Sequence, residues 1–140
     1  MLKALVPVDG SENADRAVHH VVKLVKDGEP IEIHLINVQP PFHGDVTTFV
    51  GKKTVDDYHR EEAEKALVSA RQILDVAGLK YKTHIAVGPA GETVCEFAKR
   101  LGVDKIVMGT RGLGGLAGLL MGSVATDVIK NAPVPVTLVK

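Results

Sequence analysis

The stretch DKIVMGTRGLGGLAGLLMGSVATDVIKNA (104–132) contains the pattern from which the fold can be worked out. It opens with an apolar run typical of a buried strand, 104–109, and closes with a helical pattern, 123–132. Between them, residues 109–123 hold six of the chain's fourteen glycines and a single charge, Arg111. A glycine-rich turn from a strand into a helix is a frequent ligand site in α/β proteins.

The rest of the chain repeats this alternation of strand and helix. Further strands are predicted at 2–8, 31–38, 80–87 and 134–139, and further helices at 12–28, 55–77 and 90–102. Residues 39–54 show no convincing period and are predicted to form a long loop. The alternation predicts a parallel sheet covered on both faces, as a single three-layer α/β/α domain over 1–140.

Each predicted helix carries an apolar stripe that is expected to face the sheet. The stripes consist of Ala14, Ala17, Val18, Val21, Leu24 and Val25 in the first helix, Ala63, Ala66, Leu67, Ala70, Ile73, Leu74 and Ala77 in the second, Val94, Phe97, Ala98 and Leu101 in the third, and Val124, Val128, Ile129 and Ala132 in the last.

The character of the strands predicts their order. The runs at 4–8 and 105–108 are almost wholly apolar, as expected of central strands. Polar residues alternate along 80–87, and Pro135 interrupts 134–139, so these two are expected at the edges. The order 3-2-1-4-5 fits these properties and defines a Rossmann-like fold. Ligands of such folds bind where the strand order reverses, here at the ends of strands one and four, 6–11 and 107–112.

Composition excludes several classes of function. Lys plus Arg and Asp plus Glu both total 17, so the zero net charge offers no overall field for nucleic acid. The uncharged run 113–121 is far shorter than the roughly twenty residues of a membrane span. The single cysteine, Cys95, is predicted to be a small, buried apolar residue. With one cysteine the chain cannot form an internal disulfide, which favours a reducing compartment, the cytoplasm. The six histidines lack metal-binding spacing and are expected to be structural or exposed, so no metal site is predicted among the side chains.

The glycine stretch could bind phosphate through its backbone. Gly109 and Gly112 flank the exit from the strand, where glycine lets N–H groups and a ligand approach closely. Gly122 and Ser123 open the last helix, whose free N–H groups favour an anion, and Ser123 is also the predicted N-cap. Arg111 adds a cation. The chain contains neither a P-loop nor a dinucleotide fingerprint, so the residues alone leave nucleotide binding open.

GTRGLGGLAGLLMGS matches the spacing G-x2-G-x9-G-S/T and resembles the nucleotide motif of the universal stress protein family. LVPVDGSENADRAV, HLINVQP, VGPAGETVCEFAKRLGVDKIVMGTRG and PVPVTLV resemble the family's other segments, so the resemblance spans the whole chain. It implies an adenine nucleotide alpha hydrolase-like fold that binds ATP. Carried over by position, the ligand-binding residues are Pro7, Val8, Asp9, Val38, Met108, Gly109, Arg111, Gly112, Gly122, Ser123, Val124 and Ala125.

The resemblance further implies a regulatory module in the stress response with little or no catalysis, and a homodimer joined through 134–139. Ala125 stands where the family often has a hydroxyl, and 113–121 lacks the family's frequent lysine or arginine. Both departures predict a greater dependence on Mg²⁺ or Mn²⁺. A slow or partner-activated ATPase is the alternative, with Asp9 as the one carboxylate nearby. A flavodoxin-like electron carrier would need a flavin-stacking aromatic, and the chain has five aromatics and no tryptophan.

Overall fold

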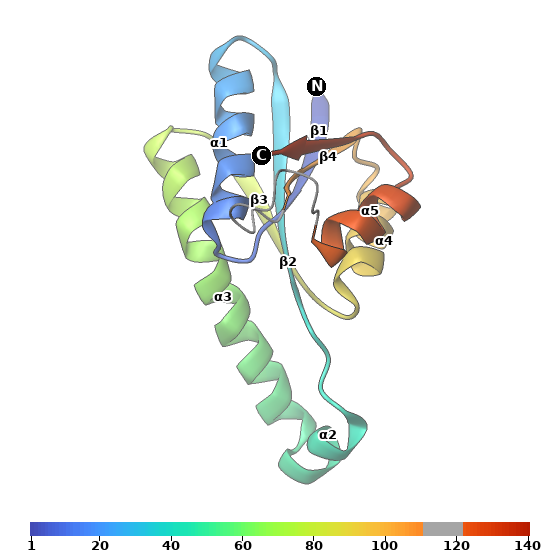
Figure 1. The fold of residues 1–140 in the computed structure, drawn as a ribbon. Coiled ribbons are helices and arrows are strands. Elements are labelled where there is room, and N and C mark those ends of the chain that lie inside the picture. The colour runs from blue at the N-terminus through green and yellow to red at the C-terminus, as the bar shows by residue number, and fades with distance from the viewer. Residues whose placement is uncertain (111–121) are drawn as a thin grey trace.

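A computed structural model describes residues 1–110 and 122–140 and contains one sheet with helices on both faces (Figure 1). The strands are β1 (Leu2–Pro7), β2 (Ile31–Gln39), β3 (Tyr81–Val87), β4 (Lys105–Gly109) and β5 (Val136–Val139). The helices are α1 (Glu12–Lys26), α2 (Gly44–Val50), α3 (Lys52–Val76), α4 (Ala90–Leu101) and α5 (Ser123–Asn131).

The sheet is parallel throughout and runs β3-β2-β1-β4-β5, which confirms the predicted order. Ala4, Leu5 and Val6 of the central strand β1 are completely buried, because helices cover both of their faces. β3, at one edge, contains only half-buried and exposed residues. Pro135 precedes β5 at the other edge, where its missing N–H interrupts no central ladder.

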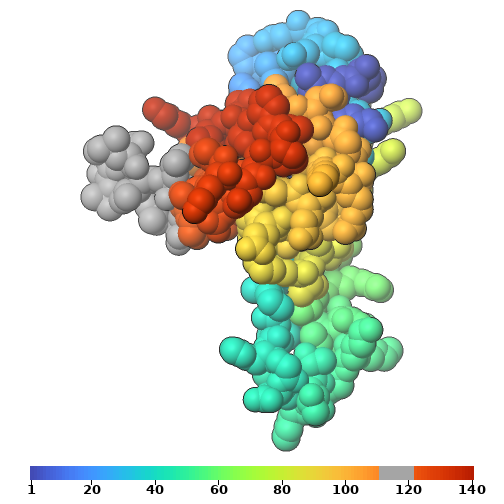
Figure 2. Space-filling view, turned by 90° about the vertical axis from the view of Figure 1, so that its right-hand side faces the viewer, coloured from blue at the N-terminus to red at the C-terminus, as the bar shows by residue number. Residues whose placement is uncertain are grey.

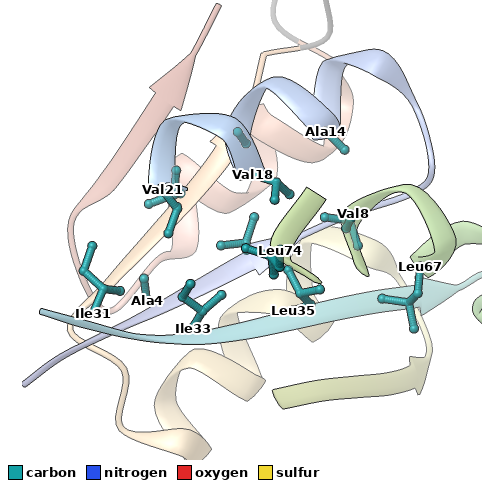
Figure 3. Packing of buried hydrophobic residues seen from close by; sticks show 14 residues of the cluster. Ala4, Val8, Ala14, Val18, Val21, Ile31, Ile33, Leu35, Leu67 and Leu74 are labelled. Atoms are coloured by element: carbon teal, nitrogen blue, oxygen red, sulfur yellow. The ribbon is translucent and has the colours of Figure 1, made fainter. Parts of the chain in front are cut away.

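Two hydrophobic clusters hold the layers together. α1 and α3 cover one face of the sheet. Val18 of α1, Leu74 of α3 and Leu35 of β2 belong to the cluster of side chains that joins these helices to the sheet (Figure 3). α4 and α5 cover the other face around Leu5, Ile36 and Ile106. Val134, Val136 and Leu138 pack on this second cluster and Val139 on the first, so the C-terminal segment contributes to both faces.

Two sequence predictions of the helices are wrong. The predicted loop at 39–54 contains α2 and the first turn of α3, which extend away from the sheet (Figures 1 and 2). No residue of α2 is buried, so this helix has no apolar period to detect. In α5, Val124 and Ile129 are exposed rather than inward, because only the narrow stripe of Ala125, Val128 and Ala132 reaches the second cluster.

Two buried histidines, His34 and His59, and the half-buried His84 form contacts between neighbouring elements. His34 on β2 places Nε2 2.6 Å from Glu32 Oε2 and Nδ1 2.9 Å from His84 Nε2 on β3. Hydrogen bonding to His34 lowers the pKa of the Glu32 carboxyl, and burial lowers the pKa of His84. His59 places Nε2 3.0 Å from the Pro40 carbonyl and stacks on Phe42. These contacts give the three histidines structural roles in joining neighbouring elements.

Candidate functional site

A cavity of about 680 Å³ opens at the carboxyl ends of β1 and β4, where the strand order reverses. Its volume lies within the range of small-molecule sites. Ten of the sequence-predicted site residues line it: Pro7, Val8, Asp9, Val38, Met108, Gly109, Gly122, Ser123, Val124 and Ala125. The other two predicted residues, Arg111 and Gly112, lie outside the residues that the structure describes.

The floor of the cavity is apolar and well packed. Val8, Met108 and Ala125 are each at most 5% exposed and belong to the two hydrophobic clusters. Ile36 and Val94 add further apolar surface from β2 and α4. A floor of this kind suits a flat ring such as a nucleobase, because the ring can bury its faces without displacing polar groups.

Three helices begin at the rim of the cavity. The first residues of α1, α4 and α5, namely Glu12, Ala90 and Ser123, all line it. Each helix presents backbone N–H groups and the positive end of its dipole at this point. The rim is therefore suited to an anion, whereas the floor is suited to an apolar ring.

The start of α1 is shaped by the Asp9–Gly10–Ser11 turn. Gly10 has a φ of +85° and lies against the backbone of Ala66, so glycine meets a conformational requirement there. Asp9 Oδ1 accepts hydrogen bonds from the Ser11 backbone N–H at 3.0 Å and hydroxyl at 2.5 Å. Ser11 in turn caps α1 by accepting from the Ala14 N–H at 3.1 Å. These bonds fix the position of the Asp9 carboxylate at the mouth of the cavity.

The start of α5 differs from the sequence prediction. The N-cap is Gly122, whose carbonyl accepts the first helical hydrogen bond from the Thr126 N–H at 3.0 Å. The predicted capping role of Ser123 is wrong, since Ser123 is already the first helical residue. Ser123 is exposed and lines the cavity, and its hydroxyl forms no hydrogen bond with another residue of 1–110 or 122–140.

Gly109 has a structural reason to be glycine besides ligand access. A Cβ at this position would lie 2.7 Å from Cγ and Oδ1 of Asn13 and closer still to the Asn13 backbone carbonyl oxygen. A Cβ atom essentially never lies so close to another heavy atom, so the glycine allows α1 to approach β4. The sequence predicts that a ligand approaches Gly109 closely, whereas part of the space beside it is taken by a neighbouring helix.

The structure adds cavity residues that the sequence analysis did not single out. Asn13 and Arg16 contribute from α1, and Asn37 contributes from β2. Asn37 is 3% exposed, donates to the Val8 carbonyl at 2.8 Å and accepts from Gln39 Nε2 at 2.8 Å. The available signal for Asn37 was its place at the carboxyl end of the predicted strand 31–38, the end at which ligands of such folds bind. Arg16 gave no such signal, because one polar residue on a helix surface is ordinary.

These features place the protein among doubly wound α/β proteins that have a cavity suited to an anion at the point where the strand order reverses. The model of the universal stress protein family matches residues 1–140, and the chain belongs to that family. Universal stress protein MJ0531 of Methanocaldococcus jannaschii is 34% identical over 146 residues, which cover 99% of this chain and 81% of the relative.

Solved structures agree with this membership. The structure of hypothetical protein MJ0577, which is 34% identical, matches with a TM-score of 0.81 over 99% of this chain and 95% of the other. A universal stress protein from Archaeoglobus fulgidus, solved in complex with dAMP, matches with a TM-score of 0.71 over 100% and 98% of the two chains. At 22% identity, the second likeness shows the shared fold alone.

Among the helices of residues 1–110 and 122–140, none has the length and hydropathy that a membrane crossing requires.

Proposed function

We propose that this chain is a regulatory module of the stress response that binds an adenine nucleotide, with ATP as its principal ligand and little or no catalysis. The observation that carries the proposal is the cavity with an apolar floor and a rim of three helix N-termini. A nucleotide has the matching distribution of properties, with a flat ring at one end and phosphates at the other. The dAMP complex of the A. fulgidus protein is consistent with an adenine nucleotide in this fold.

In this proposal, Val38 packs on the adenine, Asp9 holds the nucleoside, and Met108 and Gly109 lie beneath the ribose. Gly122, Ser123, Val124 and Ala125 receive the phosphates, together with Arg111 and Gly112. Mg²⁺ or Mn²⁺ would neutralise phosphate charge. The hydroxyl oxygen of Ser123, which is not the N-cap of α5, could coordinate the metal ion. We also place the module in the cytoplasm, in keeping with the free, buried thiol of Cys95.

The test of this function is the identity and affinity of the nucleotide. We expect that protein purified from cells and then denatured releases an adenine nucleotide that mass spectrometry identifies. Calorimetry on the stripped protein should show ATP binding in the micromolar range, about 7–8 kcal/mol. Phosphate release measured on the same sample distinguishes a binding module from the alternative of a slow ATPase. No released nucleotide, with no heat and no thermal shift at millimolar Mg-ATP, would contradict nucleotide binding.

We also propose that the chain forms a homodimer through residues 134–139. β5 lies at the sheet edge, and the Pro135 carbonyl accepts from the Ile106 N–H at 3.0 Å. In an extended strand the N–H and C=O of one residue point the same way, so the missing N–H of Pro135 faces β4. The backbone groups of Val136 and Leu138 then face outward, where an antiparallel copy could pair with them around a two-fold axis.

The dimer predicts a mass in light scattering near twice the 14.9 kDa of the chain. Thr137→Lys is expected to shift this mass toward the monomer, because it places like charges opposite each other near the axis. Thr137 is half-buried and polar, so it tests the interface with less damage to the core than Val136, which packs on the second hydrophobic cluster. A wild-type mass of 14.9 kDa at every concentration would rule out the dimer.

A further inference from the structure

Among the described residues, the charges that line the cavity suit a polyphosphate only if one particular side chain takes part. Within residues 1–110 and 122–140, the charged residues that line the cavity are Asp9, Glu12 and Arg16. Two carboxylates repel a phosphate chain, and Arg16 is the one cation among these described residues. Its guanidinium is therefore the available countercharge on this side of the cavity.

Arg16 is poorly satisfied in its present position. It is half-buried on α1, and its Nη2 donates to Asn13 Oδ1 at 3.3 Å, a long hydrogen bond. Its Nε is buried and has no hydrogen-bond partner among the described residues. No carboxylate among the described residues lies within ion-pair distance, although Glu12 is one helical turn away. A guanidinium with spare donors can form the two parallel hydrogen bonds by which arginine holds phosphate.

The backbone beneath Arg16 is held firmly in place. The adjacent Ala17 is completely buried in the first hydrophobic cluster. Asn13, which accepts the hydrogen bond from Arg16, packs against Gly109 at the end of β4. Arg16 thus lines, from a fixed base, a cavity that the start of α5 also lines. Such a base lowers the entropy lost when the guanidinium is ordered around a ligand.

We propose that Arg16 binds the phosphate chain of the ligand and sets the preference of the cavity according to the number of phosphate groups. This inference rests on the proposed function for the adenine part of the ligand, but the contact itself requires only a polyphosphate. It assigns to α1 the cationic contact that residues 113–121, which contain neither lysine nor arginine, lack.

The test compares Arg16→Gln with the wild type by calorimetry against ATP, ADP, AMP and adenosine. We expect ATP affinity to fall by roughly 10- to 100-fold, the range for losing a hydrogen-bonded charge. The loss should shrink with each phosphate removed and vanish for adenosine. Arg16→Lys keeps the charge but loses the planar guanidinium, so its affinity for ATP should lie between those of the wild type and Arg16→Gln.

Arg71→Gln is the matched control. Arg71 also has a buried Nε without a partner, but it lies on α3, is ion-paired with Glu64 at 3.1 Å, and does not line the cavity. Its substitution removes an equivalent charge and should leave all four affinities unchanged. If Arg71→Gln lost as much affinity for ATP as Arg16→Gln, the effect would come from the net charge of the protein and not from a contact with phosphate, and the inference would be overturned.

Inorganic tripolyphosphate separates this inference from the proposed function. If the wild type binds tripolyphosphate and Arg16→Gln does not, the contact stands even where ATP itself fails to bind. Equal losses of ATP and adenosine affinity would make Arg16 a structural residue, and binding of neither probe by the wild type would end both proposals. Should Arg16→Gln not fold, as judged by circular dichroism, Arg16→Lys must lose more affinity for ATP than for adenosine, and equal losses refute the contact.

Discussion

Gly109→Ala is expected to destabilise the folded protein by about 3 kcal/mol, the upper end of the usual cost of overpacking. The added methyl group would lie 2.7 Å from the Asn13 side chain and would also collide with a backbone oxygen of α1. A side chain could rotate away, but a helix backbone cannot move without disturbing Ala14 and Ala17, which are buried against the sheet. A loss of this size is a large part of the total stability of an ordinary domain.

Urea denaturation measures this loss, with Gly44→Ala as the control. Gly44 has no atom within 4 Å of an added Cβ and begins the exposed helix α2. The same substitution there should leave stability unchanged or raise it by about 0.5–1 kcal/mol through the unfolded chain. If both variants unfold at the same urea concentration, close packing of α1 on β4 is not the reason for glycine at 109.

The sheet could be predicted from the sequence because burial leaves a direct mark on strand composition. β1 reads as an unbroken apolar run, and its central residues are buried on both faces. β3 reads as alternating, and none of its residues is fully buried, although Tyr81 packs on the first cluster and Ala86 on the second. These contrasts fixed the strand order without any knowledge of the contacts between strands.

The errors occurred where burial is slight. α2 touches no part of the core, so its sequence carries no period, and Gly51 with a φ of +90° separates it from α3. In α5 the apolar residues Val124 and Ile129 extend beyond the stripe that the sheet can cover. Val124 instead lines the cavity. Hydrophobic patterning cannot distinguish an apolar residue that lines a cavity from one that packs in the core.

The candidate site was only partly visible in the sequence. The residues at strand ends and in the glycine motif could be named because the switch-point rule and the family resemblance both point to them. Arg16 could not, because its importance depends on which flank of α1 borders the cavity. That flank is set by the contact between Asn13 and Gly109, two residues far apart in the chain. Tertiary packing of this kind leaves no local pattern.

Gly122→Val is expected to weaken ATP binding by roughly 100-fold, the effect of losing one or two charge-assisted hydrogen bonds to phosphate. Gly122 is the N-cap of α5 and lines the cavity beside Ser123. A branched side chain at this point would occupy space where phosphate is expected to approach the free N–H groups of the helix. The affinity measured by calorimetry should fall with little change in circular dichroism.

We expect Gly122→Val to fold, so that a loss of ATP affinity can be attributed to the binding site and not to unfolding. Gly122 has a φ of −66° and a ψ of 162°, an extended conformation that valine readily adopts. Exchanging glycine for a poorer N-cap should cost about 1 kcal/mol of stability. Gly44→Val, at the start of α2 and outside the cavity, introduces the same side chain and should leave ATP affinity unchanged. Retained ATP binding in Gly122→Val would show that the phosphates lie elsewhere. Loss of folding together with binding would make Gly122 a structural glycine, despite a backbone conformation that does not require one.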